Sequence, residues 1–196
     1  MLRLIGLIAG LLFVVVLIVV VVGALLPKGH VASRRARFSA PPDRVFAIIS
    51  DVVGTAAWRK DISKIELLPS DDGKTMFREH GGHDAITYRV EAIEPPRLMR
   101  VRIADPNLPF GGTWTYELAP RAGEGGGASA GGTELTITER GEVYNPVFRF
   151  MSRFVFSQTA TIDAYLRALG TKLGEAEPLL IAQGDRGIEP GGAPGR

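Results

Sequence analysis

The sequence predicts an α+β fold in which a curved seven-stranded antiparallel sheet wraps around a long C-terminal helix, with a transmembrane helix in front of this domain. Three patterns lead to this prediction: an uncharged apolar run at residues 4–26, alternating apolar and polar residues through most of 31–141, and apolar residues at helical spacing over 145–174. We expect a membrane segment at 1–28, one folded domain at 29–176 and a disordered tail at 177–196, which is rich in glycine and proline from residue 183.

The charges of the chain are nearly balanced. The 196 residues include 23 Lys and Arg against 21 Asp and Glu, and no Cys. Arg3 and Lys28 belong to the N-terminal segment, so the remainder carries 21 basic and 21 acidic side chains. This balance argues against a nucleic-acid partner, which requires clustered cationic side chains. The absence of Cys excludes disulfides, Cys-ligated zinc, iron–sulfur clusters and a thiol nucleophile.

The apolar run at 4–26 predicts a single membrane-spanning helix. A helix of this length measures about 34 Å, enough to cross a hydrocarbon core of about 30 Å. The alternative is a cleaved signal peptide, whose apolar region is shorter, about 7–15 residues. Lys28, Arg34, Arg35 and Arg37 follow the run, so the positive-inside rule predicts a cytoplasmic domain. These arginines either contact anionic headgroups or form a solvated strand face.

The elements of the domain are predicted from period and turn signals. An alternating strand spans residues 30–40, and Pro41-Pro42 then begins a short helix that ends before Gly54. Thr55 begins a second short helix through Trp58. Six further alternating strands are predicted at 63–68, 75–79, 86–92, 99–103, 113–118 and 135–141. The glycine-rich stretch 121–132 predicts a mobile hairpin loop.

A single long helix is predicted from Asn145 to Gly174. Asn145 suits the N-cap and Pro146 the first turn. Apolar residues then recur at spacings of three and four for about seven turns. A sheet with one apolar face needs a cover. We therefore expect this helix to lie along the concave side of the sheet and to leave an interior space.

Several stretches of the chain together carry a resemblance to a known superfamily. They are 37–46 (RFSAPPDRVF), Trp58, 88–90 (YRV), 133–139 (TELTITE) and the long final helix. With the order of elements over residues 31–176, they resemble the START-like, Bet v 1-like superfamily (SRPBCC), which includes polyketide cyclases and dehydrases. The resemblance implies a helix-grip fold around a hydrophobic cavity that relatives use to bind lipids, sterols or polyketides, and occasionally for cyclisation or dehydration. The membrane segment and the glycine-rich loop lie outside the common pattern.

Strand parity and the helix stripe predict the side chains that face the cavity. Glu139 shares its parity with Leu135 and Ile137, which places a carboxylate on the inward side. It either pairs with a cation such as Arg78, or holds a raised pKa as an acid or base, or reaches water at the rim. The alternative for the apolar members is that they simply fill the core. The candidate cavity residues are Phe38, Tyr88, Val90, Trp114, Tyr116, Leu135, Ile137, Glu139, Phe150, Met151, Phe154 and Tyr165.

His80, His83 and Asp84 form the histidine cluster of the sequence, with the spacing H-x-x-H-D. Two imidazoles and a carboxylate could ligate zinc. However, Gly81-Gly82 places them on a flexible turn, so a solvated hairpin is the preferred interpretation. We assign no metal, no cofactor and no catalytic residue from the sequence.

These patterns and the resemblance predict a membrane-anchored protein that binds a hydrophobic small molecule or lipid in an internal cavity. One alternative is a cyclase or dehydratase that uses Glu139, Tyr88 or Tyr144 for proton transfer. A second alternative is a membrane interaction module that binds no ligand, which predicts a filled interior and an exposed apolar patch.

Overall fold

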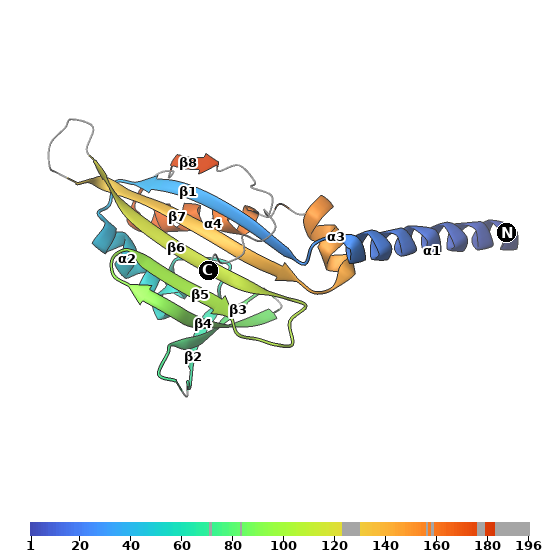
Figure 1. Ribbon diagram of the computed structural model, residues 1–196, viewed down its shortest axis with the longest axis horizontal. Helices are drawn as coiled ribbons and strands as arrows, with labels where there is room; N and C mark the ends of the chain where they lie inside the picture. Colours follow the sequence, from blue (N-terminus) through green and yellow to red (C-terminus); the bar gives the residue numbers. More distant parts are fainter. Residues whose placement is uncertain are drawn as a thin grey trace, which may run out of the picture.

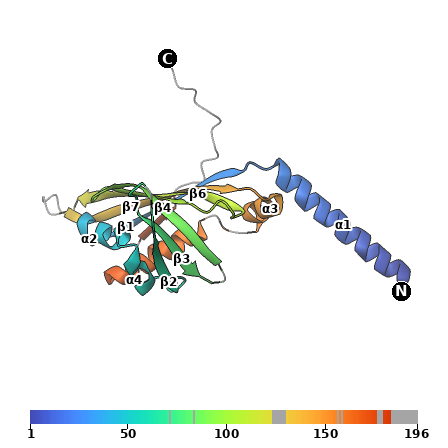
Figure 2. The same cartoon turned by 90° about the horizontal axis from the view of Figure 1, so that it is seen from below.

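The computed structural model describes residues 1–70, 72–82, 84–122, 130–155, 157, 159–175 and 179–182. A curved sheet forms one layer of the domain and helices cover its concave side (Figures 1 and 2). Helix α1 (Leu2–Leu25) projects away from this domain at the end where α3 lies. The α+β architecture predicted from the sequence is therefore confirmed.

The sheet contains the seven predicted strands and one further strand. Its order is β2-β3-β4-β5-β6-β7-β1-β8, and every neighbouring pair is antiparallel. Because β1 closes beside β7, the first strand joins the end of the meander. The strands are β1 (Gly29–Phe38), β2 (Lys64–Leu68), β3 (Met76–Gly81), β4 (Asp84–Glu94), β5 (Leu98–Ile103), β6 (Phe110–Ala122), β7 (Ala130–Val143) and β8 (Leu179–Ala182).

Two sequence assignments change at the ends of strands. Residues 179–182, assigned to the disordered tail, form β8, which pairs with Arg34–Arg37 of β1. Leu180 packs against the core, which gives this apolar run a reason to join the sheet. The predicted loop 121–132 is shorter than expected, because β6 extends to Ala122 and β7 begins at Ala130. Residues 123–129 and 183–196 lie outside the described residues.

The predicted long C-terminal helix is wrong: the chain forms two helices instead. These are α3 (Pro146–Phe154) and α4 (Ala160–Leu173). Asn145 caps α3, its side chain accepting from Val147 N at 2.9 Å. Between the helices, Ser157 and Thr159 hydrogen-bond through their hydroxyls, and such local side-chain bonding competes with helix continuation. The other helices are α2 (Pro42–Ser50) and the 3₁₀ helix η1 (Val53–Ala57).

The core lies between α4 and the concave face of the sheet. Arg34 of β1 fixes the start of α4, donating to Asp163 Oδ1 at 2.9 Å and to the Thr159 hydroxyl at 2.6 Å. Arg35 and Arg37, on the opposite face of β1, both pair with Glu134 of β7. The largest fully buried apolar side chains come from β1, β7, α2 and α4: Phe38, Val45, Leu135, Ile137, Ile162, Leu166 and Leu169.

Helix α1 is long and apolar enough to cross a membrane. The span Arg3–Leu25 has a mean hydropathy of 3.4 and makes almost no contact with the domain along its length. Its last turn is the exception, because Gly23 is buried against the first residue of α3, Pro146. Only the C-terminal end of α1 is therefore joined to the folded domain.

Candidate ligand-binding site

A small cavity of about 70 Å³ lies between α4 and the sheet. Its walls come from the end of α2, from η1 and the residue that follows its C-cap, from β3 to β6, and from the start of α4. The lining is mostly apolar and aromatic with one cation and one carboxylate. The lining residues are Ile49, Val52, Thr55, Arg59, Phe77, Glu79, Tyr88, Met99, Val101, Trp114, Tyr116, Thr161 and Tyr165.

Tyr165 of α4 stands at the centre of an aromatic cluster. Its ring centroid lies 5.4 Å from that of Trp58, 6.0 Å from Trp114 and 5.5 Å from Tyr116. The two tryptophans meet it edge to face, a geometry that aromatic quadrupoles favour. The rings occupy most of the interior, so the cavity has room for about two water molecules, each needing about 30 Å³. This cavity, formed by described residues, is thus far smaller than the resemblance implies.

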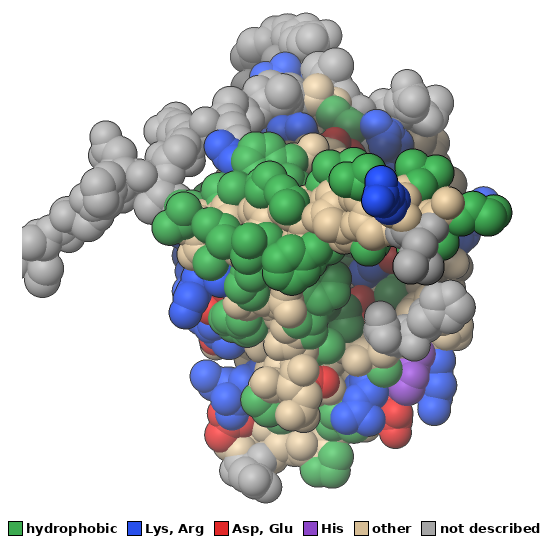
Figure 3. All heavy atoms as spheres, turned by 90° about the vertical axis from the view of Figure 1, so that its right-hand side faces the viewer, with side chains coloured by type: hydrophobic (Ala, Val, Ile, Leu, Met, Phe, Trp, Pro, Cys, Tyr) green, Lys and Arg blue, Asp and Glu red, His purple; other side chains and the backbone are tan. Residues whose placement is uncertain are grey.

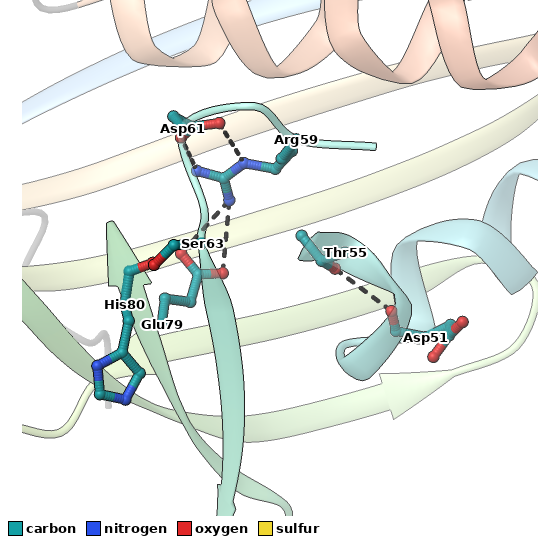
Figure 4. Close-up of polar contacts among 7 residues, drawn as sticks. All are labelled: Asp51, Thr55, Arg59, Asp61, Ser63, Glu79 and His80. Atoms are coloured by element: carbon teal, nitrogen blue, oxygen red, sulfur yellow. Dashed lines mark hydrogen bonds and ion pairs between the residues drawn. The ribbon is translucent and has the colours of Figure 1, made fainter. Parts of the chain in front are cut away.

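A half-buried ion pair forms part of the cavity wall (Figure 4). Arg59 Nη1 lies 3.4 Å from Glu79 Oε2, and both side chains are 14% exposed. The Arg59 guanidinium also binds the carboxylate of Asp61, which is largely exposed. The Cζ atom of Arg59 lies 5.6 Å from the centre of the Tyr165 ring. Arg59 therefore connects the aromatic interior with the solvent-exposed edge of the domain.

Burial changes the acid–base properties of these groups. It raises the pKa of Glu79 above its ordinary value, and the attraction of Arg59 offsets this effect only in part. At Arg59, burial lowers the pKa, but hydrogen bonding to Asp61 and the charge of Glu79 outweigh it, so the net pKa rises. Burial also raises the pKa of Tyr88, Tyr116 and Tyr165. At neutral pH the cavity therefore holds a firmly charged guanidinium beside three neutral phenols.

An open groove of about 570 Å³ adjoins the cavity beside strand β4. Val52 and Met99 line both spaces and separate them. The groove runs between the end of α2, the β2–β3 turn and β4, where a bulge interrupts pairing between Val90 and Ala92. Its volume falls within the range of about 300–1,000 Å³ typical of small-molecule sites.

The structure brings together four of the predicted cavity residues: Tyr88, Trp114, Tyr116 and Tyr165. Val90 lines the neighbouring groove instead. Phe38, Leu135 and Ile137 point inward as predicted but are fully buried in the core and line neither space. For these three, the alternative that they fill the core describes their position.

Phe150, Met151 and Phe154 do not lie in the cavity. They belong to α3, which packs against α1, and Phe154 is largely exposed. Because the helix is interrupted between α3 and α4, these side chains do not face the sheet. Their apolar spacing of three and four residues nevertheless matches that of the apolar residues in α4. The prediction assumed a single helix from Asn145 to Gly174, whereas α3 ends at Phe154.

Glu139 lies beside His30, at 3.6 Å between Oε1 and Nε2, and its side chain is 22% exposed. Arg78 is not its partner, because Arg78 donates to the Thr87 hydroxyl at 3.2 Å. Tyr144 is exposed and donates to Glu142 Oε2 at 3.0 Å. Neither Glu139 nor Tyr144 lines the cavity.

The histidine cluster does not assemble in the described part of the chain. His80 pairs with Glu66 at 3.2 Å on neighbouring strands, and His83 lies outside the described residues. Among the described residues, no group of three His, Asp or Glu side chains is placed to hold a metal ion.

Sequence reasoning missed the ion pair of the cavity wall. Glu79 has the parity of Phe77 on β3, so the rule that indicated Glu139 could have found it. Arg59 follows Trp58 in an irregular segment, where no periodicity shows which way a side chain points.

The helix-grip arrangement and the enclosed aromatic cavity define a START-like protein. A family model described as polyketide cyclase / dehydrase and lipid transport matches residues 30–174. The chain belongs to this family. No curated protein matches it in sequence.

Solved structures share the fold at low sequence identity. A START superfamily protein from Mycobacterium smegmatis has a TM-score of 0.57 and 15% identity, covering 74% of this chain and 97% of that one. The Zhui aromatase/cyclase from Streptomyces sp. R1128 has a TM-score of 0.56 and 16% identity, covering 74% and 94%. Norcoclaurine synthase from Thalictrum flavum has a TM-score of 0.55 and 13% identity, covering 75% and 87%. At these identities the likeness concerns the fold alone.

Proposed function

We propose that this chain is a membrane-anchored binding protein for a hydrophobic small molecule or lipid, which it holds between α4 and the sheet. The observation that carries the proposal is the Arg59–Glu79 pair in the wall of an aromatic cavity. An apolar lining with a few convergent polar groups is the usual composition of a small-molecule site. The guanidinium suits a polar or anionic end of the ligand, since Arg offers several donors in a fixed plane.

The adjoining groove supplies the volume that the inner cavity lacks. The cavity of about 70 Å³ accepts only a small group, whereas the groove of about 570 Å³ accepts most of a small molecule. Met99, one of the two side chains between them, is unbranched and rotates easily. In this proposal the ligand lies in the groove and inserts one end past Met99 toward Arg59.

The family and α1 support the remaining parts of the proposal. The family description includes lipid transport, and the matched Zhui structure is an aromatase/cyclase, so hydrophobic ligands are the favoured class. The helix α1 would keep a domain spanning residues 29–176 at a membrane, and the basic residues after it favour the cytoplasmic side. Tethering would raise the local concentration of the domain near ligands that dissolve in the bilayer.

Ligand entry can be measured by tryptophan fluorescence. Trp58 and Trp114 are the two tryptophans of the chain, and both pack against Tyr165. In the full chain in detergent, a dansyl-labelled fatty acid bound inside is expected to receive energy from them. Arg59→Met is expected to weaken this binding about 10- to 150-fold, because a hydrogen bond to a charged group contributes about 1.5–3 kcal/mol.

The matched control is Arg97→Met, which removes an exposed arginine from the β4–β5 turn and is expected to leave affinity unchanged. A melting curve recorded for each variant separates loss of binding from loss of folding. Absence of saturable energy transfer in the wild-type chain would refute ligand binding. It would favour a filled interior and a membrane interaction module.

An enzymatic cyclase or dehydratase is the second candidate, and the placement of Glu79 favours it. Glu79 carries a raised pKa and lines the same cavity as Tyr88, as a general acid or base would. Glu79 replaces Glu139 and Tyr144 in this role, because neither of them lines the cavity. With a substrate identified by native mass spectrometry, Glu79→Gln should abolish turnover and preserve binding if the chain is an enzyme.

A further inference from the structure

The short helix α3 exposes its apolar side. Tyr144 and four residues of α3 and its C-cap are 41–59% exposed, although all are large and apolar or aromatic. We call this set the α3 patch. Figure 3 views the end of the molecule from which α1 projects and shows hydrophobic side chains gathered in one band, which includes those of α1. The α3 patch comprises Tyr144, Val147, Phe148, Phe154 and Val155.

The apolar residues of α3 share one side of the helix. At about 100° per residue, Val147, Phe148, Phe154 and Val155 fall within an arc of about 120°. Arg149 points the opposite way and is buried. Exposed apolar side chains are normal when scattered, but a contiguous group marks an interaction surface.

Backbone contacts fix α3 to the end of α1. Arg149 Nη1 donates to the carbonyl oxygens of Leu26 at 2.9 Å and Ala24 at 3.4 Å. Because α1 ends here, these carbonyl oxygens have no hydrogen-bond donor from a following turn of the helix. Gly23 touches the Pro146 backbone so closely that an added Cβ would lie 1.9 Å from the Pro146 oxygen. The first turn of α3 is therefore held against the last turn of α1.

The direction of α3 relative to α1 determines how α3 would lie against a membrane. Figure 1 shows α3 crossing the end of α1 at a steep angle rather than continuing it. When α1 crosses a bilayer, α3 then lies near the plane of the membrane surface. An amphipathic helix in this plane buries its apolar side about 5–10 Å into the boundary between headgroups and acyl chains.

The geometry points to a membrane-docking role for the α3 patch, with a phospholipid bilayer as its partner. The patch is continuous with α1, which is itself apolar and exposed, so a single apolar medium can cover both. Tyr144 at the edge of the patch is of the amphipathic aromatic type enriched at membrane interfaces. This inference rests on the proposed membrane span and adds a second attachment that orients the domain.

Depth-dependent quenching tests both attachments in the full chain. The sequence has no Cys, so single labelling sites can be introduced without a background. A nitrobenzoxadiazole label is attached at Val15→Cys, Phe154→Cys or Glu117→Cys, and the chain is reconstituted in phosphatidylcholine vesicles. Lipids carrying a nitroxide near the headgroup should quench the label at 154, and lipids with a deep nitroxide the label at 15. The label at 117, an exposed position on β6 that lines neither the cavity nor the groove, should resist both.

The outcomes separate this inference from the proposed span. A label at 15 that no lipid quenches would refute the span and the docking role together. A label at 15 quenched by deep nitroxides, with a label at 154 quenched only by aqueous iodide, would overturn docking and preserve the span. Self-quenching of the label at 154 without lipid quenching would assign the patch to a second copy of the chain and overturn docking.

A charge placed in the patch provides an independent test. Phe148→Asp combined with Val155→Asp should abolish shallow quenching of the label at 154, because a carboxylate is costly among acyl chains. The matched control Ile93→Asp alters an equally exposed apolar residue on β4 and should leave the quenching unchanged. Unchanged quenching in the double variant would contradict a membrane-docking role.

Discussion

The cavity wall and the α3 patch depart from the usual distribution of residues in opposite directions. The cavity holds Arg59 and Glu79, two charged side chains, among aromatic rings and largely away from water. The α3 patch holds Phe148 and Phe154 in contact with water. Elsewhere in the described domain, charged residues pair mainly on its surface, as Arg35 does with Glu134.

The two regions differ in what compensates their unfavourably placed side chains. Inside, the charges are compensated by each other and by Asp61, so the pair persists in the protein alone. On α3, nothing in the described residues covers the apolar arc, so within that part of the chain its exposed side chains have no apolar partner. A buried polar group thus indicates an internal site, while an exposed apolar group indicates an external surface.

Two phenylalanines provide the largest contrast. Phe77 is buried against Tyr88 with ring centroids 5.5 Å apart, whereas Phe148 is 51% exposed. We expect Phe77→Ala to lower the free energy of unfolding by about 3–5 kcal/mol, because it leaves a cavity. Phe148→Ala should change it by no more than about 0.5 kcal/mol. Denaturant titration of the full chain in detergent measures both, and a large effect of Phe148→Ala would mean that α3 belongs to the folding core.

Breaking the half-buried Arg59–Glu79 pair should have the next largest effect. Arg59→Met leaves Glu79 buried without its cation and should cost about 3 kcal/mol of unfolding free energy. Adding Glu79→Leu should recover most of this loss, because an apolar pair needs no compensation. Chemical denaturation of the single and double variants measures the difference. A double variant as unstable as Arg59→Met would show that the two side chains act independently.

The contact between α1 and α3 can be broken at one glycine. Gly23→Ala should force α3 away from α1 and cost about 1–3 kcal/mol, since its Cβ would overlap the Pro146 backbone. Gly10→Ala is the matched control, because nothing lies within 4 Å of its Cβ. Spin labels at Val15→Cys and Phe154→Cys report the separation of the helices by double electron–electron resonance. An unchanged distance distribution in Gly23→Ala would show that α3 is not held in place by this contact.

The smallest effect concerns pH. The pKa of the Glu79 carboxyl is higher in the folded chain than its ordinary value of 4.5. The protonated carboxyl therefore stabilises the folded chain fully below pH 4.5. This stabilisation is lost as pH rises through the pKa of the folded chain. The pKa of Asp61 is lower in the folded chain than its ordinary value of 3.8, so the ionised carboxylate stabilises the folded chain above pH 3.8. This stabilisation is lost as pH falls below 3.8 through the pKa of the folded chain. In Glu79→Gln the decline above pH 4.5 should disappear in denaturant titrations at stepwise pH. A decline that persists would assign it to another group.

Most of the sheet could be predicted from the sequence, because alternation over β4 to β7 directly encodes a sheet with one apolar face. The same rule placed Tyr88, Trp114 and Tyr116 on the cavity side, and the helical spacing of apolar residues placed Tyr165 there. It failed where spacing carries no directional information. The apolar stripe of α3 remains in phase with that of α4, so the break at 155–159 left no mark in the periodicity.

The interior volume could not be predicted either. The pattern shows which side chains point inward but not whether their rings meet or stand apart. Tyr165 contacts Trp58, Trp114 and Tyr116, and this packing is decided by a helix and strands distant in sequence. Arg59 was beyond prediction for a similar reason, since an irregular segment carries it to the cavity.

The link between α1 and the sheet is very short. Helix α1 ends at Leu25 and β1 begins at Gly29, so three residues, spanning at most about 10 Å, join them. With α1 in a bilayer, the domain cannot swing far from the lipid surface or reach across to a facing compartment. If the domain binds a ligand as proposed, we therefore expect the ligand to be exchanged with partners in the same membrane, which the chain reaches by lateral diffusion in the bilayer.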